Sequence, residues 1–266
     1  MNYLHIGGIL LRNILLIRRS WARIMSLFYW TTLELFLWGF ITLWIRTIAP
    51  SDIKMNFAVV LLGALIFWHL FIRVQQSITL GFMEDVWSHN VINMFAAPVK
   101  VKEFLLGLVL LSVVQGFIAF GFLALLAWIL YALEIWAIGF AILPFFLNIF
   151  LFGWTLGFVT IGLIIRFGPS IDVFAFSVPI LFQPLSAVFY PLHILPDIFQ
   201  KIAFFLPTTH LFEGMRKVLL EGVFPLEHVI WATCLNLVYV AFGLLFFSWM
   251  LRIARKRGFL SRLATD

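Results

Sequence analysis

Two ionisable residues, Glu34 and Arg73, lie inside long apolar stretches of the chain. An isolated charge at the centre of a membrane costs about 2.5 to 3.5 kcal/mol on insertion scales, so such residues pair with one another or face a polar cavity. If the two stretches cross a membrane in opposite directions, Glu34 and Arg73 come to similar depths. We therefore predict a charge pair between them, which either fixes the packing of two helices or takes part in gating.

Other residues of reactive types lie nearer the C-terminal end of the chain. His193, Asp197, His210 and Glu213 belong to the classes of side chain that bind metal ions or act as general acids and bases. The sequence contains no P-loop pattern, no G-x-S-x-G and no H-E-x-x-H, and its only cysteine, Cys234, lies in an apolar stretch. We expect no catalytic residue, no metal site and no cofactor bound by this chain.

The elements that must position these residues are membrane helices. Hydrophobic residues make up 64% of the 266 residues and charged residues 11%, whereas soluble domains have roughly half and roughly a quarter. A spanning helix needs about 20 apolar residues, and the chain has room for about six. We predict an all-α membrane protein, a single transmembrane domain over residues 1–266, with spans at 25–48, 57–82, 104–132, 137–165, 171–190 and 228–251.

The basic residues predict the orientation of these spans. The net charge is +6, but Lys and Arg gather beside the apolar stretches, where they set topology rather than bind nucleic acid. Most of them fall on the side that carries both termini if the spans are even in number. We therefore predict that both termini are cytoplasmic and that 252–266 is a basic cytoplasmic tail.

Two segments outside the spans have helical patterns of their own. Residues 1–24 carry basic side chains on one face, which predicts an amphipathic helix in the membrane interface. Prolines divide residues 191–227 into pieces too short to cross, which predicts broken outer helices between spans five and six. The basic face consists of His5, Arg12, Arg19 and Arg23, and the prolines are Pro191, Pro196, Pro207 and Pro225.

A polar break separates the second and third spans. The residues from Glu84 to Lys102 contain a short amphipathic pattern that ends before Pro98. A surface helix of this kind can dock into a groove on a partner protein. An ordinary amphipathic loop helix on the lipid surface has the same pattern. The residues that we assign to a docking helix are Glu84, Asp85, Trp87, Val91, Met94 and Phe95.

The fifth predicted span contains two prolines, Pro179 and Pro184. Each removes a backbone donor and bends a membrane helix. We therefore predict that this span lines and gates a pathway through the protein. The residues assigned to the pathway or its gate are Phe182, Gln183, Pro184, Phe189 and Tyr190.

Two regions of the sequence resemble the permeases of type-2 ABC transporters. One looks like the cytoplasmic coupling segment of that family, and the other is similar to its signature around span five and the outer helices. The first region is Ala97-Pro98-Val99 followed by Glu103, Leu105 and Gly107. The second comprises Gln183-Pro184-Leu185-Ser186, Val188-Phe189-Tyr190-Pro191-Leu192, Leu206-Pro207-Thr208-Thr209-His210 and Glu213-Gly214-Met215-Arg216.

The resemblance implies a half-transporter in a plasma membrane, such as the bacterial inner membrane. Two permease copies, as a homodimer or with a related permease, would sit above two copies of a separate ATPase subunit that binds ATP and Mg. They would export a substrate through the dimer interface, with membrane lipids as neighbours and without nucleic acid. The polar helix between spans two and three would contact the ATPase. Lipids, hydrophobic drugs and lipid-linked glycans stay open as substrates.

Two other functions fit the same residues. An ion-coupled carrier would use Glu34 and Arg73 and would transport without an ATPase. A membrane-embedded enzyme would use the outer histidines and carboxylates and would be active as a single chain.

Overall fold

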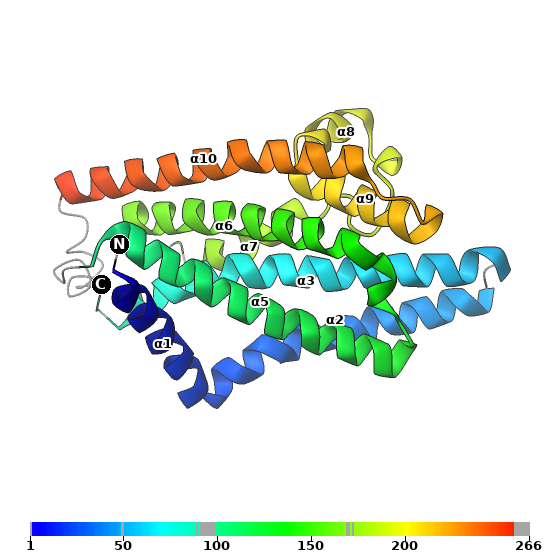
Figure 1. Ribbon diagram of the computed structural model, residues 1–266, viewed down its shortest axis with the longest axis horizontal. Coiled ribbons are helices and arrows are strands. Elements are labelled where there is room, and N and C mark those ends of the chain that lie inside the picture. Colours follow the sequence, from blue (N-terminus) through cyan, green and yellow to red (C-terminus); the bar gives the residue numbers. More distant parts are fainter. Residues whose placement is uncertain are drawn as a thin grey trace.

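The computed structural model describes residues 2–48, 51–88, 90, 99–168, 171 and 173–257. The described residues form helices and connecting segments without a strand, which confirms the all-α class. Figure 1 shows long helices that run roughly along one direction. The elements are α1 (Tyr3–Arg19), α2 (Trp21–Ile48), α3 (Ser51–Trp87), α5 (Val101–Tyr131), η1 (Ile135–Ala141), α6 (Ile142–Phe167), α7 (Val173–Phe182), η3 (Leu192–Ile194), α8 (Asp197–Phe204), α9 (Pro207–Glu221) and α10 (Leu226–Arg257).

Within the described part of the chain, five helices are long and apolar enough to cross a membrane. They correspond to the first four predicted spans and to the last. The multi-pass membrane character expected from composition is thereby supported. The candidate spans are Trp21–Ile45, Val59–Trp87, Val101–Tyr131, Ile138–Phe167 and Leu226–Arg257.

The predicted fifth span, 171–190, differs from the structure. Its helix, α7, covers only Val173–Phe182, which is 10 residues or about 15 Å of helix, half of a hydrocarbon layer of about 30 Å. The chain then forms turns, because Pro184 lacks a backbone donor and disfavours helix at the preceding residue. Ala187 has a φ of 51°, which no right-handed helix accommodates. The six-span count stays a prediction.

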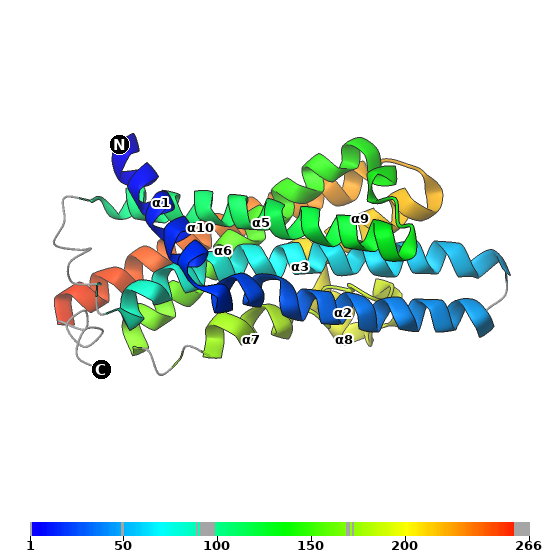
Figure 2. The ribbon, with the colours of Figure 1, turned by 90° about the horizontal axis from the view of Figure 1, so that it is seen from below.

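The bundle has two distinct ends. Figures 1 and 2 place α1, the start of α5 and the end of α10 at one end, which we call the α1 end. The short helices α8 and α9 lie toward the opposite end, the α9 end. The start of α1 and the end of α10 therefore share one side, as the prediction for the termini requires, and its assignment to the cytoplasm stays a prediction.

Helix α3 forms the centre of the bundle and contacts α2, α5, α6, α7 and α9. Its most apolar stretch is 78% buried, against 18% for α2 and 17% for α10. Trp68, Phe67 and Phe71 on α3 are fully buried. A helix that is apolar all round is buried by its neighbours, so α3 is the central helix on which these five helices pack.

Two glycines allow α6 to approach α3 closely. A Cβ at Gly153 would lie 2.7 Å from Cγ1 of Val74, and a Cβ at Gly157 would lie 2.8 Å from Cγ2 of Ile78. Both distances are shorter than real Cβ contacts, so only glycine fits there. Small residues spaced in this way let membrane helices pack backbone to backbone, and here they do so within one chain.

Replacing Gly157 with leucine is expected to destabilise the protein by about 1–3 kcal/mol or more, because the new side chain must displace Ile78. Gly121→Leu is the matched control, since nothing lies within 4 Å of a Cβ at that position. Thermal unfolding of the two purified variants in one detergent measures the difference. Equal midpoints would contradict the close α3–α6 contact.

Candidate functional site

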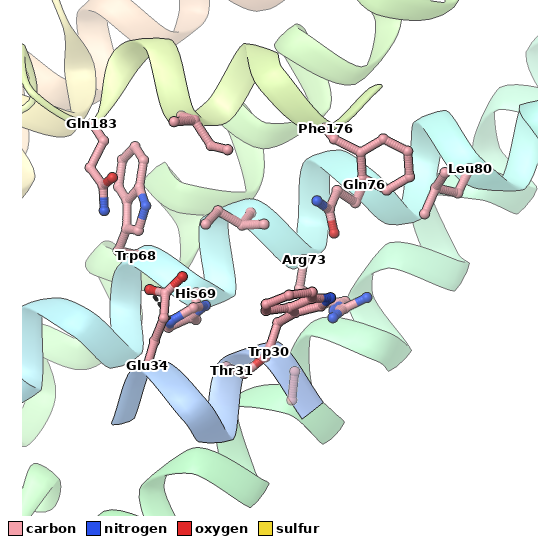
Figure 3. Close-up of a pocket in the computed structure, with 13 residues that line it drawn as sticks. Trp30, Thr31, Glu34, Trp68, His69, Arg73, Gln76, Leu80, Phe176 and Gln183 are labelled. Atoms are coloured by element: carbon pink, nitrogen blue, oxygen red, sulfur yellow. Dashed lines mark ion pairs between the residues drawn. The ribbon is translucent and has the colours of Figure 1, made fainter. Parts of the chain in front are cut away.

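A pocket of about 510 Å³ lies between α2, α3 and α7 (Figure 3). It combines ionisable, amide and aromatic side chains inside apolar helices. The lining residues are Trp30, Thr31, Glu34, Trp68, His69, Ile72, Arg73, Gln76, Leu80, Ala119, Phe176, Ile180 and Gln183. A polar cavity of this kind inside spanning helices is a candidate substrate or ion pathway.

Glu34 on α2 lies against His69 on α3. The distance from Glu34 Oε2 to His69 Nε2 is 3.1 Å, and the Glu34 side chain is 45% exposed while that of His69 is 7% exposed. Figure 3 shows the carboxylate and the imidazole facing one another at the pocket wall. The pair therefore joins α2 to α3 and leaves part of the carboxylate open to the pocket.

Arg73 lies one helical turn farther along α3 than His69. Its Nη2 donates a hydrogen bond of 3.0 Å to the carbonyl of Leu27 on α2. The contact that the structure gives Glu34 is thus His69 rather than the predicted Arg73, because His69 is the residue of α3 at the level of Glu34. Both predicted charges nevertheless line the same pocket, which meets the requirement that intramembrane charges face a polar environment.

The rest of the pocket wall is aromatic. Trp30 and Phe176 line it from α2 and α7, and Trp68 lines it from α3. The indole Nε1 of Trp68 is buried and has no hydrogen-bond partner in the described part of the chain. Buried donors are nearly always paired, so this N–H is available to a bound molecule or to water.

A second pocket, of about 270 Å³, continues from the first along α3. The two share Arg73, Leu80 and Phe176 in their walls. Gln115 and Glu84 also line the second pocket. Since Glu84 lies near the end of α3, the two pockets together extend from Glu34 toward the α1 end of the bundle.

Phe182 is the last residue of α7, and the other predicted gate residues lie in the turns that follow it. Phe182 packs edge to face on Phe152, with ring centroids 5.8 Å apart, and Phe189 stacks on Trp38 of α2 at 4.4 Å. The Tyr190 hydroxyl donates to the carbonyl of Pro184. Of the predicted gate residues only Gln183 lines the first pocket, so Phe182, Pro184, Phe189 and Tyr190 lie beside the pocket and not in its wall.

A buried arginine on α9 holds this turn in place. Arg216 Nη2 donates to the carbonyls of Ala187 and Val188, and Arg216 Nη1 lies 2.8 Å from Glu213 Oε1. The same carboxylate oxygen accepts a hydrogen bond of 2.7 Å from the backbone N–H of Leu192. The charge pair thereby binds the second part of the segment that carries the predicted gate and the residue Leu192 just after it.

The chain was compared with family models and with curated proteins. The model described as ABC-2 type transporter matches residues 8–220. The chain belongs to the ABC-2 type transporter family. The comparison with curated proteins finds no match. The match runs from within α1 to the last turn of α9 and includes both regions on which the resemblance to type-2 ABC permeases rests.

The predicted docking helix of this ABC-2 type protein falls partly on α3. Glu84, Asp85 and Trp87 belong to the last turns of that helix, so they do not begin a separate helix as predicted. The reason is that charged partners from the N-terminal region neutralise the acidic side chains and let α3 continue past its apolar stretch. Val91, Met94 and Phe95 lie outside the described residues.

Three polar contacts join the N-terminal region to α3 and α5, two of them from α1 and one from the start of α2. Arg12 of α1 binds Asp85 with both terminal nitrogens, at 2.7 and 2.8 Å, and Arg23 of α2 binds Glu84 at 2.8 Å. His5 Nδ1 lies 3.0 Å from Glu103 Oε2. Because Asp85 lies at the start of the predicted coupling segment, 84–102, and Glu103 follows its end, α1 contacts the chain at both ends of that segment.

The remaining polar candidates are distributed among structural contacts. Gln75 bonds Thr79 and Thr160, and Asn148 bonds Thr233 and Asn236. Among the outer residues, His210 Nε2 lies 2.8 Å from the carbonyl of Phe204. Burial lowers the pKa of His210, so the fold favours the neutral ring. No group of three or more potential metal ligands gathers among the described residues.

Proposed function

We propose that this chain is the membrane permease subunit of an ATP-driven exporter, with two copies of the permease and two copies of a separate ATPase. The family match and the five candidate spans support a membrane component of an ABC transporter. Such a permease is not itself catalytic, and ATP and Mg would be bound by the partner. Localisation in a bacterial inner membrane, with both termini cytoplasmic, is part of the proposal.

The observation that carries the proposal is the pair of connected pockets along α3. They place Glu34, His69 and Arg73 beside Trp30, Trp68 and Phe176 inside apolar spans. Polar groups for a headgroup and aromatic walls for an apolar part suit an amphipathic molecule. The proposed substrates are therefore amphipathic or hydrophobic, as lipids, drugs and lipid-linked glycans are. Glu34 and Arg73 act in this proposal as two charges of one pathway.

The proposed coupling segment lies between Trp87 and Val101. Trp87 is the last residue of α3 and is half exposed. Val91, Met94 and Phe95 would complete an apolar face that docks on the ATPase, with Glu84 and Asp85 at its base. The contacts of α1 with Asp85 and Glu103 support this role, since a segment that transmits force has to be anchored at both ends.

Isolation of the tagged protein from native membranes in a mild detergent tests the coupling to an ATPase. We expect a P-loop subunit to copurify and to carry the ATPase activity, which a substitution of its P-loop lysine abolishes. The permease purified alone should hydrolyse no ATP. Hydrolysis by the single chain would overturn the proposal, and so would transport without any ATPase.

The pathway itself is tested by thiol labelling in a Cys234→Ser background, because Cys234 is exposed. Thr31→Cys places a thiol in the wall of the first pocket, whereas Leu33→Cys places one on an exposed apolar position of the same helix. A charged, membrane-impermeant thiol reagent should label the first variant several-fold faster than the second. Equal rates would remove the pocket from the pathway.

One observation favours a second candidate, an ion-coupled carrier. The Glu34–His69 contact brings a carboxylate within 3.1 Å of an imidazole, in a pocket within the apolar helices. This candidate requires transport driven by an ion gradient in vesicles that contain the permease alone, which is the result that excludes the exporter.

A further inference from the structure

A second large concavity lies on another face of the bundle. A groove of about 750 Å³ runs between α5, α6 and α10 and shares no lining residue with the pockets along α3. Its walls are almost entirely apolar, with Leu105, Val109, Phe158 and Leu244 among them. The hydroxyl of Ser248 donates to the carbonyl of Leu244 within α10, so it offers no unpaired donor to the groove. These walls suit hydrocarbon.

One end of the groove is strongly basic. Lys102 of α5 and Arg252 and Lys256 of α10 line it, and all three are exposed. Arg255 also lines it. None of the described residues that line the groove is acidic. Since the start of α5 and the end of α10 meet at the α1 end (Figure 1), the cations gather where the apolar walls reach the surface of a membrane.

The apolar part of the groove has the length of one leaflet. On α10 the lining residues extend from Val240 to Lys256, and the apolar ones end at Leu251. The stretch from Val240 to Leu251 corresponds to about 17 Å at 1.5 Å per residue. Half of a hydrocarbon layer of about 30 Å is about 15 Å. An acyl chain that begins at the basic end and follows α10 therefore stays within the leaflet on that side.

We propose that this groove is a binding site for an anionic phospholipid of the leaflet at the α1 end. The phosphate and any further acidic group lie at Lys102, Arg252 and Lys256, and an acyl chain lies along the apolar walls. Basic pockets between spanning helices select anionic headgroups in this way. The site is separate from the proposed pathway, so the inference does not rest on the proposed function.

The charge and shape of the groove favour a lipid over a soluble anion or a second copy of the chain. A soluble anion would use the cations but leave the apolar walls uncovered, which costs free energy in proportion to their area. In a two-fold dimer that buried this groove the same patch would face itself, so the basic ends would come close to their own like charges. A lipid satisfies both the walls and the cations.

Native mass spectrometry of the delipidated protein tests the site. Phosphatidylglycerol and phosphatidylcholine with identical acyl chains are titrated into the full chain in detergent. We expect phosphatidylglycerol to bind at least about tenfold more tightly. The triple variant Lys102→Gln/Arg252→Gln/Lys256→Gln should lose this preference. The control Arg18→Gln/Arg19→Gln, which changes two exposed arginines of α1, should keep it.

A second pair of variants tests the groove itself. Val240→Trp fills its wall, whereas Leu237→Trp places the same side chain on an exposed position of α10 outside it. The first should weaken phosphatidylglycerol binding several-fold and the second should not, at equal melting temperatures. Equal binding of the two lipids, an unchanged preference in the triple variant, or full competition by inorganic phosphate would overturn the proposal.

Discussion

Replacing Arg216 with methionine is expected to destabilise the protein by about 3–5 kcal/mol, the cost of breaking a buried charge pair by removing one partner. Arg216 is 8% exposed in its side chain and is bound by Glu213 and by the carbonyls of Ala187 and Val188. Its loss leaves the Glu213 carboxylate without its charged partner and removes the side-chain donor of the Ala187 and Val188 carbonyls. The thermal unfolding midpoint in detergent should fall steeply.

Two further variants show whether this loss has the proposed cause. Lys217→Met changes the neighbouring, partly exposed cation and should leave the midpoint almost unchanged. Adding Glu213→Leu to Arg216→Met removes the orphan carboxylate and should recover part of the stability, as a double-mutant cycle measures. Strictly additive losses, or equal midpoints for the two cation variants, would mean that the pair does not hold the turn after α7.

Replacing Asp85 with alanine is expected to abolish most ATP-driven transport while the permease still binds lipid and still folds. Asp85 is 1% exposed and binds Arg12 through both of its oxygens, and Asn90 donates to it at 3.0 Å. Hydrogen bonds to charged groups contribute about 1.5–3 kcal/mol each. Loss of the Asp85 carboxylate removes these bonds and separates α1 from the start of the proposed coupling segment. ATP hydrolysis by the partner should then continue, while little substrate is transported for each ATP hydrolysed.

The charge swap Arg12→Asp/Asp85→Arg distinguishes this ion pair from a general requirement for the two side chains. It should restore part of the transport that either single reversal loses. Arg18→Ala is the control on the same helix, because Arg18 is exposed, and it should behave as the parent protein. Full transport in Asp85→Ala would show that α1 plays no part in coupling.

Hydropathy and length are local properties, and they predicted the long helices well. The stretches that became α2, α3, α5, α6 and α10 each contain enough apolar residues in a row to cross a membrane. The same measures failed between Gly168 and Tyr190, where the chain is apolar but prolines and a left-handed residue end the helix at Phe182. The apolar composition of this stretch indicates burial, but the backbone restrictions of its prolines and of Ala187 determine where the helix ends.

Glu34 and Arg73 stood out in the sequence, but the contacts that these two residues make were not predicted. The similar depths of Glu34 and Arg73 predicted a charge pair, whereas the structure places Glu34 against His69, and Glu34 and Arg73 line the same pocket. That Glu34 meets His69 depends on how α2 is rotated against α3, which no spacing within either stretch encodes. Likewise the end of α3 could not be placed from its own residues, because Arg12 and Arg23 make Glu84 and Asp85 compatible with a continuing helix. Trp30 and Phe176 gave no signal in a chain so rich in aromatic residues.

The close contacts of the glycines also decide which parts of the molecule can move. Gly153 and Gly157 lock α6 against α3, and Gly243 on α10 lies so near Thr155 that a Cβ there would be 3.2 Å from its carbonyl oxygen. One helix of this group cannot slide past another, since a shift would bring larger side chains into the places of the glycines. Helices α3, α6 and α10 therefore behave as one rigid frame. The pocket borders this frame on the α3 side, while α2, α7 and Ala119 of α5 form its remaining walls. A change in pocket volume therefore requires movement of helices outside the frame, with the bend at Ser20 between α1 and α2 as a natural hinge for α2.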